Sequence, residues 1–174
     1  MIFVTVGTHE QPFNRLVEYM DQWAENHEEP VVIQTGYSTY EPKHCEWSSM
    51  YSYDRMLEWV DDARIIITHG GPSSYFMSLR VGKVPIVVPR KAEYNEHVND
   101  HQVDYCREVE KRQGNIIVIE DIEKLGDVLD RYDEIAAAMQ SALASNNVRF
   151  CLEFEKIVND LMNIKADASE GTNR

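Results

Sequence analysis

The chain has 174 residues, of which 43% are hydrophobic and 27% are charged, a composition typical of one soluble globular domain. Its formal net charge of −13 argues against nucleic acid or an anionic bilayer as the main partner, because phosphate groups are bound by clustered lysines and arginines. No stretch approaches the roughly 20 apolar residues of a membrane helix, and the first residues lack the layout of a signal peptide. We therefore expect a cytoplasmic protein.

Apolar runs of strand length recur along the first two thirds of the chain. Five are predicted to be strands: 2–6, 31–34, 64–68, 85–88 and 115–119. Continuous valine and isoleucine runs are typical of strands that are covered on both faces, as in a parallel sheet. Residues with helical spacing lie between them, at 13–20, 56–60, 76–80 and 103–109. This alternation predicts an α/β, Rossmann-like doubly wound parallel sheet of about five strands.

Residues 36–52 form the main irregular stretch and are predicted to be a functional or mobile loop. Aromatic side chains are scattered in it and just after it: Tyr37, Tyr40, Trp47, Tyr51 and Tyr53. We expect them to pack the loop down, in preference to forming a platform for a sugar ring.

After residue 119 the chain is predicted to be helical to near Met162, in pieces separated around Tyr132 and residues 145–147. The last piece carries one continuous apolar stripe, which packs either on its own sheet or on another subunit. The stripe consists of Phe150, Phe154, Ile157, Val158 and Leu161. Polar and small residues fill 164–174, so we expect one domain over 1–163 and a disordered tail.

The turn after the third strand has the composition of an anion site. Its residues are Thr68, His69, Gly70, Gly71, Pro72, Ser73 and Ser74. A buried strand followed by two glycines, a proline suited to the first helical turn and two serines leaves backbone N–H groups free at a positive helix end. The alternative is an ordinary strand-to-helix turn with a serine cap.

Two further strands end in polar loops, and ligands bind beyond the carboxyl ends of such strands. The first strand runs into Gly7, Thr8, His9, Glu10, Gln11 and Pro12. His9 is a candidate general base or phosphate donor, or else an exposed turn residue. The loop after the fourth strand offers Arg90 and Lys91 to phosphate. The same loop offers hydroxyl-binding side chains in Glu96, His97, Asp100, His101 and Gln102.

Several chemistries are disfavoured by the absence of their motifs. The chain has no GxGxxG fingerprint, no GxxxxGK[ST] loop and no GxSxG elbow, which argues against NAD, ATP and serine-hydrolase chemistry. His97 and His101 are predicted to lie one turn apart on a helix, with Glu96 and Asp100 beside them. A metal site there is a minor alternative, because no HExxH pattern occurs.

Four segments resemble the glycosyltransferase family 28 C-terminal domain (MurG-like). They are VTVGTHEQPFNRL (4–16), ITHGGPSS (67–74), GKVPIVVPR (82–90) and EHVNDHQ (96–102). The likeness is closest to single-domain catalytic subunits of two-component bacterial polysaccharide glycosyltransferases. The chain is also similar to the eukaryotic UDP-GlcNAc transferase subunit that acts on dolichol-linked GlcNAc. The resemblance implies half of a GT-B fold, a UDP-sugar donor, an inverting transfer to a lipid-linked acceptor, and no metal or other cofactor.

The resemblance also assigns roles to residues. Gly7 and Thr8 match the turn near the diphosphate, and His69, Gly71, Ser73 and Ser74 match the phosphate-binding turn. Asp100, His101 and Gln102 match the element that reads sugar hydroxyls. Many relatives carry a ribose-binding carboxylate three residues after the second serine, where this chain has Met77. Glu93 or Glu96 is the candidate substitute.

The combined expectation is the catalytic subunit of a two-component hexosyltransferase in capsular or exopolysaccharide synthesis. His69 would help to stabilise the departing UDP, and the base would come from His9 or from the partner. In similar systems a membrane-anchored partner subunit supplies the acceptor half, and the striped last helix is the candidate docking surface, placing the protein at the inner face of the cell membrane. The alternative is a non-catalytic enhancer that activates a separate membrane-associated transferase.

Overall fold

The structure is a computed structural model that describes residues 1–139 and 147–162. The chain divides between residues 143 and 144 into two compact units. The first contains a parallel sheet with its covering helices, and the second contains one helix, α7 (Asn147–Leu161).

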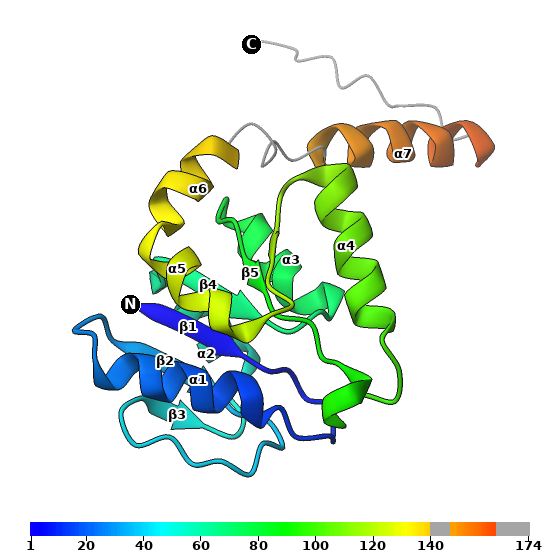
Figure 1. Ribbon diagram of the computed structural model, residues 1–174. Coiled ribbons are helices and arrows are strands. Elements are labelled where there is room, and N and C mark those ends of the chain that lie inside the picture. The colour runs from blue at the N-terminus through cyan, green and yellow to red at the C-terminus, as the bar shows by residue number, and fades with distance from the viewer. Residues whose placement is uncertain (140–146, 163–174) are drawn as a thin grey trace. The chain divides into compact units, whose positions relative to one another are not determined.

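The sheet has six parallel strands in the order β3-β2-β1-β4-β5-β6 (Figure 1). The strands are β1 (Ile2–Thr5), β2 (Val31–Gln34), β3 (Glu46–Ser48), β4 (Ile65–Thr68), β5 (Ile86–Val87) and β6 (Ile117–Val118). Strand β1 pairs with β2 on one side and with β4 on the other, so Ile2 lies opposite both Val31 and Ile65. The strand order therefore reverses between β1 and β4, which is where Rossmann-like sheets bind ligands.

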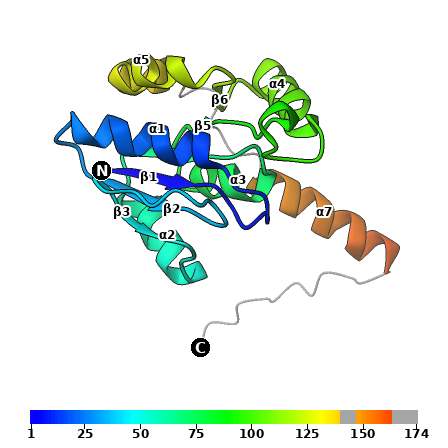
Figure 2. The ribbon, with the colours of Figure 1, turned by 60° about the horizontal axis from the view of Figure 1, so that its bottom comes forward.

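Helices cover both faces of this sheet, as a doubly wound fold requires. They are α1 (Asn14–Glu25), α2 (Tyr53–Asp62), α3 (Pro72–Arg80), α4 (His101–Gln113), α5 (Leu125–Asp130) and α6 (Tyr132–Met139), with short 3₁₀ turns η1 (Ala92–Tyr94) and η2 (Ile122–Lys124). Helices α1 and α5 lie on one side of the sheet and α2 and α3 on the other (Figure 2).

The strands build two cores by alternation. In β1, Ile2 and Val4 face the core under α1, α5 and α6, whereas Phe3 faces the core under α2. Strand β4 repeats the pattern, with Ile66 beside Phe3. Because both faces are buried, every residue of β1, β2 and β4 is buried, which explains the continuous apolar runs in the sequence.

The sheet has one strand more than the sequence predicts. Strand β3 lies inside the stretch expected to be an irregular loop and pairs with β2 in register, with Val32 opposite Glu46. It is a short edge strand whose residues are exposed or half-buried, so it has no apolar run that would reveal it. The loop aromatics Tyr40 and Trp47 donate hydrogen bonds to Asp21 Oδ2 (2.8 Å) and the Pro42 carbonyl (3.0 Å). Packing of the loop is thus confirmed for these two side chains, whereas Tyr37 and Tyr53 are more than half exposed.

The helix break expected near Tyr132 is confirmed, because α5 ends at Asp130 and α6 begins at Tyr132. Tyr132 itself is buried, and its hydroxyl donates to the Val84 carbonyl at 2.7 Å. The second expected break, at 145–147, falls mostly outside the described residues, and the expected disordered tail, 164–174, falls entirely outside them.

Helix α7 carries much of the apolar stripe predicted from the sequence. Phe154 and Ile157 are 56% and 55% exposed, and Val158 is partly exposed. The side chains of Phe150 and Leu161 lie outside the described part of the chain. Among the described residues, no helix combines the length and the apolar character needed to cross a membrane.

Candidate functional site

The loops after β1, β4 and β5 meet at the carboxyl edge of the sheet, because these three strands are neighbours. Side chains from different loops touch there: the His9 ring lies 4.6 Å from the His97 ring, centroid to centroid, and Gln11 donates to the Asn95 carbonyl at 3.3 Å. The structure thus brings together the three polar loops that the sequence singles out.

The ring of His69 lies against two glycines. A Cβ added at Gly7 would lie 2.4 Å from His69 Cε1, and one added at Gly71 would lie 2.4 Å from His69 Nε2. The two glycines belong to different loops, so only residues without a side chain let these loops close around the imidazole. Gly7 also has a φ of +74°, which L side chains rarely adopt.

The environment of His69 keeps its imidazole neutral. Burial, reinforced by the positive charge of Arg90, lowers the pKa of His69 to about 4. Its Nδ1 atom is buried and has no hydrogen-bond partner among the described residues. At neutral pH the ring can therefore offer a ligand one N–H donor, but not a positive charge.

Helix α3 presents an uncapped N-terminus to this edge. Gly71 occupies the N-cap position without a side-chain hydrogen bond, and Pro72 begins the helix. Ser73 is exposed and Ser74 is half-buried, with the Ser74 N–H donating to the Gly71 carbonyl at 3.1 Å. The N-terminus of α3 is therefore a positive helix end whose backbone N–H groups are not capped by a side chain.

Gly70, in the same turn, is needed for packing. A Cβ there would lie 2.8 Å from Gln102 Cβ and 3.1 Å from Cys106 Sγ, so α4 approaches this turn closely. Gln102 is buried, and its Oε1 accepts the Arg90 backbone N–H at 3.2 Å. Its carbonyl oxygen is thus committed to the protein, whereas the sequence suggests a sugar-reading side chain.

Arg90 also has a different position from the one expected of a phosphate-binding residue. It is fully buried, and its guanidinium donates to three backbone carbonyls: Val6 (2.8 Å), Gln11 (2.7 Å) and Glu96 (3.0 Å). Burial lowers the pKa of Arg90 to about 10, which still leaves it charged at pH 7. Arg90 thus ties the loop after β1 to the loop after β5.

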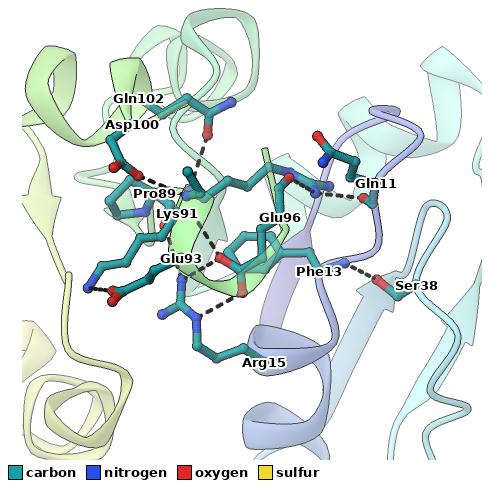
Figure 3. A network of polar contacts seen from close by, with 12 residues as sticks. Gln11, Phe13, Arg15, Ser38, Pro89, Lys91, Glu93, Glu96, Asp100 and Gln102 are labelled. Atoms are coloured by element: carbon teal, nitrogen blue, oxygen red, sulfur yellow. Dashed lines mark hydrogen bonds and ion pairs between the residues drawn. The ribbon is translucent and has the colours of Figure 1, made fainter. Parts of the chain in front are cut away.

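Glu96 is the second buried member of this tie. Its carboxylate accepts two hydrogen bonds from Arg15, both at 2.9 Å, and one from the Lys91 N–H at 3.0 Å (Figure 3). With 3% of its side chain exposed, Glu96 is enclosed by the protein. The sequence suggested that Glu96 binds a ribose or sugar hydroxyl, but its enclosed carboxylate is not placed to do so.

Sequence reasoning missed Arg15 and Gln11. Arg15 lies 81 residues from Glu96, and no local pattern links the two positions. Gln11 hydrogen-bonds the His9 ring at 2.9 Å as well as the Asn95 carbonyl. A local sequence signal for the turn that Gln11 contacts is Asn95 itself. Its φ is 56°, a conformation that asparagine tolerates better than most residues.

His97 and His101 do not lie on one helix, contrary to the sequence-based expectation. Helix α4 begins at His101, and His97 lies in the preceding bends. Their rings are nevertheless in edge-on contact, with centroids 4.5 Å apart. Asp100 accepts the Ala92 N–H at 2.8 Å, which closes the loop. Within the described residues, no group of three or more histidine, cysteine, aspartate or glutamate side chains is arranged to hold a metal ion.

The remaining predicted residues lie around the same edge. Thr8 and Pro72 are exposed. Met77 is half-buried and packs against the core under α2, so no carboxylate occupies the position that binds ribose in many relatives. Glu93, the other candidate substitute, is exposed and its carboxylate accepts from Lys91 Nζ at 3.1 Å.

Comparisons with known proteins agree on the fold. The model of the glycosyltransferase family 28 C-terminal domain matches residues 1–161. No curated protein matches the chain. Solved structures of similar fold include the glycotransferase of kitacinnamycin (TM-score 0.61, 18% identity, covering 82% of this chain and 37% of that one). The calicheamicin glycosyltransferase CalG4 is also similar (TM-score 0.57, 15% identity, covering 92% of this chain and 43% of that one). So is the glycosyltransferase SnogD from Streptomyces nogalater (TM-score 0.50, 17% identity, covering 83% of this chain and 39% of that one).

These three neighbours are more than twice as long as the region they share with this chain, since the matches cover 37% to 43% of their lengths. At 15% to 18% identity, the likeness establishes a common Rossmann-like fold of the GT-B type. The family match extends over nearly the whole described chain. By its sequence, its sheet and its converging loops, the chain belongs to the glycosyltransferase family 28 C-terminal domain family.

Proposed function

We propose that this chain is the catalytic subunit of a two-component inverting glycosyltransferase. It would transfer a hexose from a UDP-sugar to a lipid-diphosphate-linked saccharide in capsular or exopolysaccharide synthesis. The observation that carries the proposal is the uncapped α3 N-terminus beside Gly7 and His69, at the point where the strand order reverses, in a chain of this family.

The donor diphosphate is assigned to this helix end. Backbone N–H groups and the helix dipole attract phosphate without needing a basic surface, which suits a chain with a net charge of −13. Residues from the converging turns would line the site: Gly7, Thr8, Gly70, Gly71, Pro72, Ser73 and Ser74. Asp100 and His101 would face the sugar, while Arg90, Glu96 and Gln102 would support the loops from behind.

The transfer step follows from this placement. An acceptor hydroxyl oxygen attacks the anomeric carbon, the bond from that carbon to the phosphate oxygen breaks, and UDP leaves with the electron pair. The α3 N-terminus and the neutral His69 N–H would stabilise the charge that grows on UDP. The proton of the acceptor hydroxyl passes to a base, either His9 or a group of the partner.

A partner is part of the proposal because the chain resembles single-domain catalytic subunits of two-component transferases. The chain spans about two fifths of the length of its structural neighbours. We propose that a membrane-anchored subunit supplies the acceptor half and docks on the apolar stripe of α7, holding this cytoplasmic chain at the inner face of the cell membrane. Apolar side chains that are more than half exposed, such as Phe154 and Ile157, suit a contact of this kind.

A second candidate function is a non-catalytic enhancer of a separate transferase. Met77 favours it, because by the resemblance it stands where many relatives carry a ribose-binding carboxylate, and its half-buried side chain packs against the core under α2. An enhancer would need α7 but not the α3 turn.

Binding of UDP-sugars to the chain, alone and co-purified with its partner, tests the proposal. Calorimetry with UDP and a panel of UDP-hexoses, with and without magnesium, is expected to detect metal-independent binding. Ser73→Asp should weaken it at least tenfold, because the carboxylate repels the diphosphate while favouring the helix end. Ser73→Asn is the neutral control of similar size and should bind nearly as well as the wild type.

The two candidate functions give opposite results in this experiment. If the chain alone binds no UDP-sugar, and Ser73→Asp changes neither the UDP-sugar binding nor the transferase activity of the pair, the chain is an enhancer and the catalytic proposal fails.

A further inference from the structure

Three histidine rings form a contiguous cluster beside the α3 turn. His9 comes from the loop after β1, His97 from the loop after β5, and His101 from the first residue of α4. His97 is central, with its ring centroid 4.6 Å from that of His9 and 4.5 Å from that of His101. The fold thus brings His9, from the start of the chain, into contact with His97, which also contacts His101 four residues further on.

The charges that act on His97 are positive. Arg90 approaches it from the protein side, and His9 and His101 flank it. The carboxylates of the same loop are engaged elsewhere: Glu93 with Lys91, Glu96 with Arg15, and Asp100 with the Ala92 N–H. The cluster therefore has no anionic partner among these carboxylates.

His97 shows the effect of this arrangement. Burial, followed by the charges of His101, His9 and Arg90, lowers its pKa. Its Nδ1 atom is buried and has no hydrogen-bond partner among the described residues. The other two rings are oriented by neighbours, since His9 contacts Gln11 Oε1 and His101 contacts Asn99 Oδ1. An incoming anion would give His97 the counter-charge that it lacks.

We propose that His9, His97 and His101 form a proton-linked phosphate site, in which binding of a diphosphate group is accompanied by protonation of His97. The inference rests on the proposed function for its natural ligand, which is the diphosphate of the sugar donor or of the lipid-linked acceptor. In either case the group that the site binds is a diphosphate.

The sign of the pH dependence follows from the geometry. In the free protein, neighbouring positive charges oppose protonation of His97, whereas a bound diphosphate favours it. The bound state therefore holds more protons than the free state, and affinity rises as pH falls through the range where histidine titrates. The gain is at most about tenfold per pH unit for each proton taken up.

Nuclear magnetic resonance of the histidine rings tests the inference directly. The titration of His97 would be followed in the full chain, with no ligand, with inorganic pyrophosphate, and with UDP-glucose and UDP-galactose. Without ligand, His97 should titrate below the ordinary range of histidine. His27, an exposed histidine stacked on Trp23, is the reference signal. Pyrophosphate should raise the His97 midpoint by one pH unit or more and leave His27 unchanged.

The outcomes separate this inference from the proposed function. If a UDP-sugar binds but neither it nor pyrophosphate raises the His97 midpoint, the proton-linked site is wrong and the donor proposal stands. If pyrophosphate raises the midpoint but no UDP-sugar binds to the chain or to the pair, the phosphate site stands and the donor proposal fails. No rise with any ligand overturns the inference.

Calorimetry of pyrophosphate binding in two buffers of different ionisation enthalpy gives a second readout. The wild type should take up protons from the buffer on binding at pH 7, apart from those taken up by the ligand itself. His97→Asn should bind with less proton uptake, and His27→Asn, the matched control, should behave as the wild type. Equal uptake by the three proteins would count against the cluster.

Discussion

At the scale of single residues, the position of His69 depends on shape. Its ring lies against Gly7 and Gly71, and a Cβ on either would lie 2.4 Å from a ring atom. The two glycines therefore determine both the position of the imidazole and the closeness of the two loops.

This predicts a specific rescue. Gly71→Ala should destabilise the protein by about 1–3 kcal/mol through overpacking, because Gly71 has a φ of −78°, where alanine is otherwise unstrained. Adding His69→Ala should recover most of that loss by removing the ring. Denaturant unfolding of the two single variants and the double variant measures the coupling. Additive losses in the double variant would show that the ring is not the obstacle.

At the scale of elements, buried charges join α1 to the loops that carry the site. Arg15 on α1 pairs with Glu96, and Glu96 accepts the Lys91 N–H (Figure 3). Arg90 reaches the carbonyls of Val6 and Gln11. A groove of about 440 Å³ lies between α1 and the 3₁₀ turns, and Arg15 and Glu96 are in its wall. The same residues thus stabilise the fold and position the loop that carries His97.

Breaking this pair should be costly. Arg15→Ala would leave the Glu96 carboxylate buried without its guanidinium, and we expect a loss of about 2–4 kcal/mol in the free energy of unfolding. The double variant Arg15→Met with Glu96→Gln should lose less free energy of unfolding than Arg15→Ala, since it leaves neither charge of the pair buried. Arg112→Ala, which removes an exposed ion pair with Glu108, is the control and should leave the unfolding midpoint nearly unchanged. A small effect of Arg15→Ala would mean that water replaces the guanidinium.

At the scale of the whole molecule, the chain consists of a sheet domain and a separate unit that contains α7. Two apolar residues of α7, Phe154 and Ile157, are 56% and 55% exposed. Exposed apolar side chains on one helix suit a role in assembly.

The matching prediction concerns the partner. Phe154→Ser with Ile157→Ser should abolish co-purification with the partner subunit and the activity of the pair, while the thermal midpoint of the isolated chain stays within a few degrees of the wild type. The control replaces Glu153 and Glu155, on the same helix, by glutamine. It changes the charge of α7 but keeps its apolar side chains, and it should leave the complex intact. Retention of the complex by the serine variant would rule out the stripe as the docking surface.

The sequence by itself determined the fold class and the loops that carry the site. Uninterrupted apolar runs such as Ile65–Thr68 identify strands buried on both faces, and glycines before Pro72 mark a close turn, because both signals are local. The edge strand β3 was missed because an exposed three-residue strand needs no apolar residues.

Only the tertiary structure decided what individual polar residues do. Arg90 and Glu96 have the sequence pattern of ligand-binding residues, yet both are buried and bound to partners many positions away. Likewise, His9 and His97 meet only because β1 and β5 flank β4 in the sheet. Local sequence specifies backbone conformation, whereas burial and charge pairing depend on which distant segments the fold places side by side.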